Sequence, residues 1–297
     1  MEDTPTDDAG LAAVAAALGS RPVASRAVGW GDAAATHRLD LADGRSVAVR
    51  RASGAGSRAV IERAARVMRG LAAAGLPVPV ADTVHTPDAD YLVTPWIEGV
   101  TGAAWLGDPD RSIRLAEAMG ELVRRLRAVA PMAVTLDAEA AGSRALARTA
   151  GARLRRVGAA LQPGSVAAIG AAIDWLSAAD RWRPVVVHGD FAPVNVIVGA
   201  GGEILALVDL EHARLGSPMA DVAWWGWVVR HHHPDAWRVA WPTFRAAAGV
   251  PSGDLADEEI RAVMLVRLLE SVATADAADV DRRQAWAQRL DEAAAWA

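Results

Sequence analysis

One stretch of the chain combines carboxylates, a carboxamide and an imidazole directly after short hydrophobic runs that are typical of strands. These residues are His188, Asp190, Asn195, Asp209 and Glu211. Asn195 is the only asparagine in the chain, so its position five residues after an aspartate is informative. Carboxylate and amide oxygens can hold a divalent metal ion beside a phosphate group. The stretch therefore predicts a site for metal-assisted phosphate chemistry, carried by a hairpin of two short strands, 185–187 and 204–208.

The spacing H-x-D-x-x-x-x-N is the catalytic-loop pattern of kinase-type phosphotransferases. In that pattern the aspartate accepts the proton of a hydroxyl group and the asparagine binds Mg²⁺. We therefore predict Asp190 as the catalytic base and Asn195 with Asp209 as the metal ligands. The alternative for Asp190 is a loop carboxylate that caps a turn.

Residues 185–224 resemble the core of the aminoglycoside phosphotransferase and choline kinase family through the segments HGDFAPVN, VDLEHA and LGSPMADVAW. The resemblance implies an α+β, bilobal protein-kinase-like fold, with a small N-terminal antiparallel sheet lobe and a larger, mainly helical C-terminal lobe. It also implies ATP or GTP as co-substrate, Mg²⁺ as cofactor and a small-molecule hydroxyl group as acceptor. We expect a disordered tail over 1–10, a nucleotide-clamping lobe over 11–94, and a catalytic and acceptor-binding lobe over 95–297.

The composition excludes several other kinds of site. Cysteine is absent, which excludes disulfides, zinc–thiolate sites, iron–sulfur clusters and cysteine nucleophiles. Lysine is also absent, so a Walker A P-loop, which requires Gly-Lys, cannot exist. The net charge of −5, without a basic tract, argues against nucleic-acid binding. The acidic start and the short apolar run over 11–18 argue against a signal peptide and a membrane span, and we predict a cytoplasmic protein.

The nucleotide-binding residues are implied by the resemblance. Gly29 and Gly31 correspond to a glycine-rich loop that covers the phosphates. Arg50 takes the position of the lysine that neutralises the α and β phosphates, and it keeps the positive charge. The carbonyl of Thr94 and the N–H of Trp96 would pair with the adenine.

Three departures from the family pattern concern this half of the site. Besides the arginine at position 50, Ala33 and Ala34 stand where the family often has Ser-Asn, and Ala64 stands where a helical glutamate orients the cation. Glu62 is close in sequence, but an offset of two residues turns it by about 200° around a helix. It is therefore an uncertain substitute.

Apolar residues at helical spacing predict a mainly helical chain beyond position 99. Earlier helices are expected over 11–18 and 58–73. The predicted C-terminal helices are 111–129, 140–161, 166–178, 219–232, 235–248 with a kink at Pro242, and 257–297 with a break near 274–280.

Four further residues are candidates for substrate or supporting roles. Glu211 has several possible roles: it could contact metal through water, bind substrate or form a salt bridge with Arg214. His188 and Asp221 are expected to pack and to brace the catalytic loop. Glu270 is one of ten acids in the last 47 residues, against five arginines. An acidic pocket there would favour a polycationic acceptor, whereas solvated helix faces are the alternative.

Two aromatic or basic clusters have competing interpretations. The tryptophans between 224 and 241 suit either an aromatic cage for a cation or a helix core, and we expect the core. The triplet 231–233 of histidines is expected to close a helix at its negative end.

The sequence as a whole predicts an ATP- or GTP-dependent O-phosphotransferase acting on an aminoglycoside-type or other antibiotic hydroxyl group. A choline- or amino-alcohol-type metabolite kinase is one alternative. A catalytically weak, kinase-like nucleotide-binding module is the other.

Overall fold

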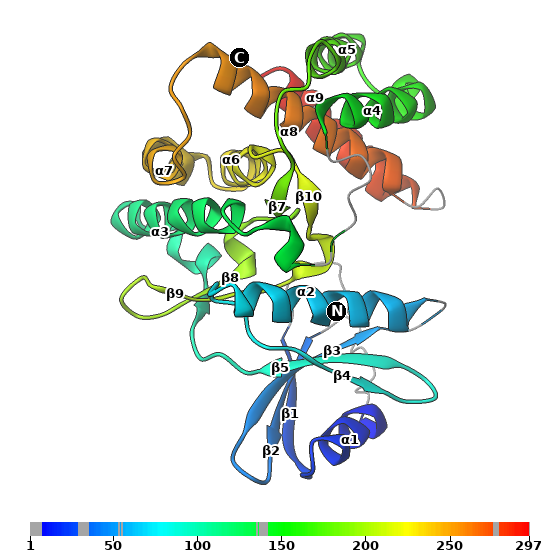
Figure 1. Cartoon of the computed structure of the whole chain (residues 1–297), viewed down its shortest axis with the longest axis vertical. Coiled ribbons are helices and arrows are strands. Elements are labelled where there is room, and N and C mark those ends of the chain that lie inside the picture. Colours follow the sequence, from blue (N-terminus) through cyan, green and yellow to red (C-terminus); the bar gives the residue numbers. More distant parts are fainter. Residues whose placement is uncertain are drawn as a thin grey trace. The chain divides into compact units, whose positions relative to one another are not determined.

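A computed structural model of the chain describes residues 8–28, 36–52, 54, 56–134, 136, 142–275 and 279–296 (Figure 1). The chain divides into two compact units. The first comprises Met1–Gly102, Met132–Thr135 and Val194–Glu211, and the second comprises Ala103–Pro131, Leu136–Pro193 and His212–Ala297.

The first unit is built on an antiparallel sheet with the strand order β1-β2-β3-β5-β4. Its strands are β1 (Pro22–Val28), β2 (Thr36–Leu41), β3 (Ser46–Ala52), β4 (Asp82–His85) and β5 (Asp90–Pro95). Two helices accompany the sheet, α1 (Asp8–Ala17) and α2 (Ser57–Ala73). Leu11 and Val14 of α1 are buried in one core cluster with Leu39, Val49 and Tyr91 of the sheet. The sheet holds β3, which carries Arg50, between two neighbouring strands.

A second, smaller sheet of the first unit carries the predicted metal ligands. It has the order β6-β8-β9, from β6 (Val100–Thr101), β8 (Val196–Val198) and β9 (Ile204–Leu207). This pairing places 194–211 with the N-terminal unit, although 95–297 was predicted as one lobe. The predicted tail also differs, because α1 begins at Asp8, inside the range 1–10.

The second unit is mainly helical (Figure 1). Its helices are α3 (Pro109–Arg127), α4 (Ser143–Val157), α5 (Pro163–Ser177), α6 (Ala220–His232), α7 (Pro234–Ala247), α8 (Asp254–Thr274) and α9 (Val280–Ala294). The chain also contains short 3-10 turns, some of which lie where the chain passes from one unit to the other. They are Gly102–Trp105, Pro131–Ala133, Gly158–Ala160, Pro193–Asn195 and Leu210–His212. The helices lie close to the predicted ranges, because a buried apolar face at helical spacing is the strongest signal in a sequence.

The strand β7 (Val185–Val187) was expected in one hairpin with the strand that ends at Asp209, and this expectation is wrong. It pairs instead with β10 (Arg214–Gly216), antiparallel and within the second unit. A strand of three residues offers too few side chains for its partner to be identified from its sequence.

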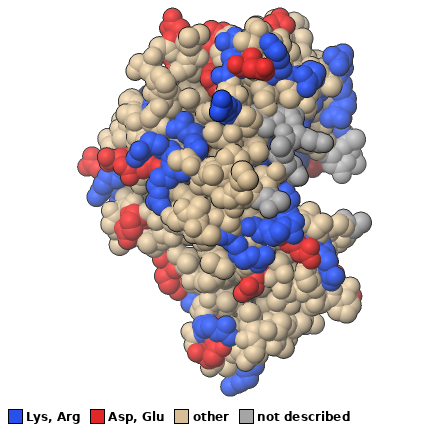
Figure 2. Space-filling view, in the orientation of Figure 1, with Lys and Arg blue, Asp and Glu red and all other residues tan. Residues whose placement is uncertain are grey.

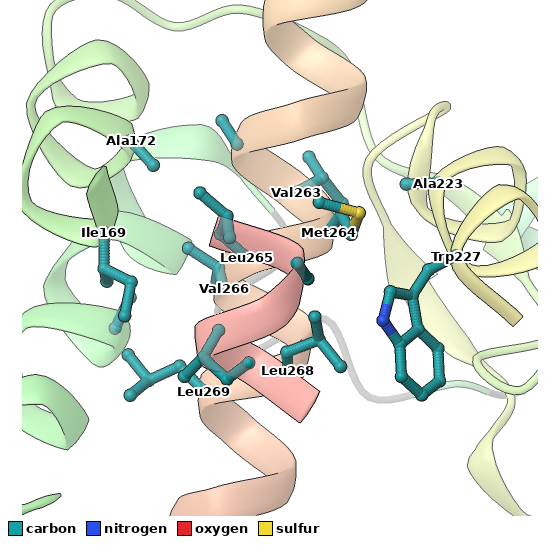
Figure 3. Packing of buried hydrophobic residues seen from close by; sticks show 14 of the residues in the cluster. Ile169, Ala172, Ala223, Trp227, Val263, Met264, Leu265, Val266, Leu268 and Leu269 are labelled. Carbon is teal, nitrogen blue, oxygen red and sulfur yellow. The ribbon is translucent and has the colours of Figure 1, made fainter. Parts of the chain in front are cut away.

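The core of the second unit forms around α8 (Figure 3). Leu265, Leu268 and Leu269 of this helix belong to one buried cluster with Ile169 of α5 and Trp227 of α6. Beside it, Trp225 of α6 stacks on Phe244 of α7 with ring centroids 3.9 Å apart. The tryptophans therefore mostly serve packing, as predicted.

Arginine and acidic side chains are interspersed over the visible face of the protein (Figure 2). Among the described residues, no helix combines the length and the apolar character that a bilayer crossing requires.

Candidate phosphotransfer site

Asn195 and Asp209 meet at the same end of the β8–β9 hairpin. Asn195 directly precedes β8, Asp209 follows β9, and the register pairs Val196 with Leu207. The N–H of Val208 donates to the carbonyl of Asn195 over 3.0 Å, which extends the pairing up to the two candidate ligands. Both are therefore presented together by the antiparallel register. Asn195 is only 7% exposed, so its carboxamide needs a polar partner.

The backbone at Asp209 is unusual. Its φ of 62° is the only positive value at a non-glycine residue within the described ranges. This left-handed conformation costs a residue with a Cβ on the order of 1 kcal/mol or more. Such strain persists where the surrounding structure requires one particular direction for the side chain.

Arg50 of β3 forms salt bridges with both acidic residues that follow β9. Its Nη1 lies 2.6 Å from Oδ1 of Asp209, and its Nη2 lies 2.6 Å from Oε2 of Glu211. Burial lowers the pKa of Arg50, but the charges of Asp209 and Glu211 outweigh burial and raise the pKa above its ordinary value. The guanidinium is therefore a permanent cation, and its planar fork suits either two carboxylates or phosphate oxygens.

Neither Ala64 nor Glu62 supplies a partner for Arg50. Ala64 is buried, and Oε1 of Glu62 lies 3.8 Å from Nε2 of His85 instead. The orienting carboxylates thus come from the β9 end. Glu211 pairs with Arg50, whereas the predicted partner was Arg214, whose Nη2 lies 3.5 Å from Oε2 of Glu270. The nearby Arg63 adds a hydrogen bond of 3.1 Å from Nη1 to the carbonyl of Glu211.

The predicted nucleotide contacts have different outcomes. Gly29 and Gly31 lie outside the described residues. Thr94 is paired with Ala48 in the β3–β5 ladder. The N–H of Trp96, expected to be available to adenine, donates to the carbonyl of Ser46 over 2.9 Å. The expectation for Trp96 is therefore wrong, because the residue continues the sheet pairing one step past β5.

In the second unit, a buried aspartate shapes the loop that contains Asp190. Oδ2 of Asp221 accepts the N–H of His188 over 2.8 Å, and Oδ1 accepts the N–H of Gly189 over 3.0 Å. Asp221 is 1% exposed, and its burial raises the pKa of this carboxyl group. His188 is also buried, and its Nδ1 accepts the N–H of Asp190 over 3.2 Å. His188 and Asp221 thus hold the loop backbone, which is the arrangement expected from the sequence.

Gly189 is required at this position for two reasons. Its φ of 82° lies in the left-handed region, and a Cβ would collide with the carbonyl oxygen of His212. Only glycine lets the loop turn this closely against the neighbouring segment.

Trp224 of α6 contacts the predicted catalytic base directly. Its Nε1–H donates to Oδ1 of Asp190 over 2.6 Å, a charge-assisted hydrogen bond. The sequence interpretation placed Trp224 in the helix core and missed this role. A signal was present, because Trp224 lies three residues after Asp221 and hence on the same helix face.

A cavity of about 200 Å³ lies beside this loop. Gly189 and Trp224 form part of its wall, together with apolar residues of α4 and α8 such as Leu146, Val263 and Val266. The cavity thus lies next to Asp190, because Gly189 directly precedes this aspartate in the chain and Trp224 hydrogen-bonds to it.

Three arginines and one glutamate also line the cavity, and they form a connected cluster. Glu270 of α8 lies 2.7 Å from Arg153, 3.0 Å from Arg267 and 3.5 Å from Arg214. Burial alone would raise the pKa of Glu270, but these three cations outweigh burial and lower it. The negative charge of Glu270 is therefore balanced by its neighbours. The acidic composition of the last 47 residues did not indicate these arginines, two of which lie earlier in the chain.

A sequence model of the phosphotransferase enzyme family matches residues 26–254. Acyl-CoA dehydrogenase family member 10 of Mus musculus is 32% identical over 203 residues, which is 64% of this chain and 19% of that protein. The chain thus spans about a fifth of the length of this curated relative.

Solved structures share the fold. A macrolide 2'-phosphotransferase type I superposes with a TM-score of 0.73 at 21% identity and 98% coverage of both chains. A macrolide 2'-phosphotransferase from Brachybacterium faecium gives 0.67 at 23% identity, covering 95% of this chain and 98% of that one. A thermostable aminoglycoside phosphotransferase gives 0.73 at 18% identity, with coverages of 95% and 97%. These likenesses confirm the predicted kinase-like α+β fold.

Proposed function

The chain belongs to the phosphotransferase enzyme family, and on that premise we propose that it transfers the γ-phosphoryl group of ATP or GTP to a hydroxyl group of a small molecule. The observation that carries the proposal is the convergence of Asn195, Asp209 and Arg50 at the end of the β8–β9 hairpin. This combination of two oxygen donors and a fixed cation suits a nucleotide triphosphate with its metal ion.

The donor set fits Mg²⁺. Within the described residues, no three histidine, aspartate or glutamate side chains gather into a metal site by themselves. Magnesium commonly takes only one or two protein carboxylates and completes its shell with water and phosphate oxygens. Asn195 and Asp209 would hold the ion, which would neutralise charge on the phosphates during transfer. Arg50 would bind the α and β phosphates, and the glycine-rich loop at 29–31 would cover them.

Asp190 would orient the acceptor hydroxyl group and accept its proton as the oxygen bonds to the γ-phosphorus. The bond between that phosphorus and the β–γ bridging oxygen breaks, and the nucleoside diphosphate leaves. Trp224 would fix the carboxylate in position, since its hydrogen bond restricts rotation of the side chain. The loop braced by His188 and Asp221 would keep the base in place.

The acceptor panel follows from the relatives and from the alternatives above. Macrolides and aminoglycosides come first, because the structures of similar fold are named for these compounds. Choline and amino alcohols test a metabolite kinase. The cytoplasmic location predicted from the sequence remains a prediction.

The test has two stages. Calorimetry with ATP and GTP, with and without Mg²⁺, measures nucleotide binding, and acceptor-dependent release of nucleoside diphosphate measures transfer. Asp190→Asn should abolish transfer and leave nucleotide affinity nearly intact, whereas Asp209→Asn should remove the dependence of binding on Mg²⁺. The exposed Asp174→Asn on α5 is the matched control.

Two results would contradict the proposal. Full phosphate transfer by Asp190→Asn would show that Asp190 is not the catalytic base. Nucleotide binding without phosphate transfer to any panel member, or to any hydroxy carboxylate or hydroxyalkyl phosphate, would identify a binding module instead of an enzyme.

A further inference from the structure

The cavity beside the Asp190 loop has a charge opposite to the one that a polycationic acceptor requires. Of its described lining residues, Arg153, Arg214 and Arg267 are basic and Glu270 alone is acidic. Glu259 hydrogen-bonds Ser217 in the wall but does not line the cavity itself. With three positive charges and one negative, the walls carry a net charge of +2. A polycation would be repelled from these walls, so the main support for a cationic acceptor is lost.

Arg267 contacts both the loop that contains Asp190 and the tryptophan that holds this aspartate. Its Nη2 donates to the carbonyl of Gly189 over 3.3 Å, and its guanidinium lies 4.9 Å from the ring centroid of Trp224. Trp224 in turn holds Asp190. One arginine is thus tied to both the backbone beside the base and the side chain that orients it.

Among the described residues, not every N–H group of Arg267 finds a hydrogen-bond acceptor. Its Nη1 pairs with Glu270, but its buried Nε–H has no hydrogen-bond partner there. The side chain is 17% exposed, and burial lowers the pKa of the guanidinium. A buried cation with an unpaired donor is costly unless an anion or another acceptor completes it.

The other lining residues of the cavity indicate what the uncharged part of the ligand should be like. Leu146, Val263, Val266 and Leu215 supply apolar surface on the same cavity. Its volume of about 200 Å³ lies below the roughly 300–1,000 Å³ typical of sites for drug-sized molecules. A compact, partly apolar molecule therefore matches it better than a macrolide or an aminoglycoside.

We propose that the acceptor is a small hydroxyl compound with an aliphatic part and one carboxylate or phosphate group, which Arg267, Arg214 and Arg153 bind while its hydroxyl group reaches Asp190. This inference rests on the proposed phosphotransferase function and specifies its substrate class. The acceptor oxygen bonds to the γ-phosphorus, its proton passes to Asp190, and the nucleoside diphosphate departs. The product is a phosphate monoester that keeps its original anionic group.

The experiment compares acceptors that differ only in charge. Hydroxy carboxylates and hydroxyalkyl phosphates of increasing chain length are each matched with the corresponding hydroxy amide and amino alcohol, and aminoglycosides are added. Acceptor-dependent nucleoside diphosphate release gives kcat/KM for each compound. We expect the anionic members to exceed their amides by about tenfold or more, as one charged hydrogen bond is worth roughly 1.5–3 kcal/mol. The carboxylate and phosphate series then identify which anion is preferred.

Arginine variants locate the anion. Arg267→Gln should raise KM for the anionic acceptors about 10- to 100-fold more than it raises KM for the matched amides. Arg214→Gln also tests whether an arginine binds the anionic group of the acceptor. The Arg214 side chain is 35% exposed, so its replacement should disturb the folding of the protein less than the loss of a buried charge. Arg148→Gln, an exposed arginine on α4 outside the cavity, is the control and should change neither class.

The inference is overturned if the wild type prefers amino alcohols or aminoglycosides, or if Arg267→Gln and Arg214→Gln weaken amides as much as carboxylates. Direct calorimetry of the hydroxy carboxylates and hydroxyalkyl phosphates separates this failure from that of the proposed function. Anion binding that is lost in Arg214→Gln without any transfer would contradict the phosphotransferase activity and support the anion site. Transfer to uncharged acceptors only would do the reverse.

Discussion

Replacing Trp224 by phenylalanine removes one donor from Asp190 and keeps an aromatic ring in the helix. The lost bond joins Nε1 to Oδ1 over 2.6 Å and is charge-assisted. Hydrogen bonds to charged groups contribute roughly 1.5–3 kcal/mol, and each 1.4 kcal/mol corresponds to a factor of about ten. If the bond keeps the base in its reactive orientation, kcat should fall about 10- to 100-fold.

The assay separates orientation of the base from general damage. The KM for the nucleotide should stay within about twofold, because Trp224 lies in the other compact unit from Arg50, Asn195 and Asp209. Thermal denaturation monitors folding, since the ring of Trp224 also stacks on Trp227 with centroids 4.8 Å apart.

Trp227→Phe is the matched control for this experiment. It lies on the same helix and in the same stack, and its buried indole N–H has no partner among the described residues. It should therefore lose packing without loss of kcat. A Trp224→Phe enzyme with a kcat within threefold of the wild type, or an equal loss in Trp227→Phe, would refute the orienting role.

Three further changes test other parts of the structure. Gly189→Ala should destabilise the protein by more than about 2 kcal/mol, because it combines a left-handed φ with a collision at a backbone carbonyl; Gly170→Ala, in a helix with open space, should be neutral or stabilising, and equal melting temperatures would contradict this. Arg50→Lys keeps the charge but not the two-pronged fork, and for this partly exposed pair we expect a loss of about 1 kcal/mol in urea denaturation, whereas an unchanged midpoint would show that the fork is not stabilising. Burial lowers the pKa of His232, so the unfolded state takes up protons first as the pH falls below about 6.5, and stability should decrease there. The free energy of unfolding at neutral and mildly acidic pH should fall less in His232→Gln than in the wild type, and parallel losses would rule out this histidine as a source.

The sequence predicted the helices well and the strand pairing less well, for physical reasons. Amphipathic helices such as α3 and α8 repeat their apolar positions over several turns, so many residues report the same face. The strands β6, β7 and β10 have only two or three residues, and their partners are chosen by tertiary contacts.

The site residues divide in the same way. Asp190 and Asn195 were predicted from their spacing, and the β8–β9 register brings Asn195 and Asp209 to the same end of the hairpin. Trp224 and Arg267 could not be selected by spacing alone, because many tryptophans and arginines occur at helical intervals. Their importance depends on which helix face meets the Asp190 loop, and only the packing of α6 and α8 determines that.

The arginine at position 50 gives a physical explanation for the missing glutamate at position 64. A lysine ammonium concentrates its charge at one point, so a single carboxylate from a helix can orient it. A guanidinium fork has two outward edges, and here Asp209 and Glu211 each occupy one prong at 2.6 Å. Both carboxylates come from the segment that follows β9, and Asp209 is itself a proposed metal ligand, so no helix side chain is needed. The two departures at positions 50 and 64 thus compensate each other, and they link Arg50, the proposed phosphate-binding cation, directly to the hairpin that we propose to bind the metal.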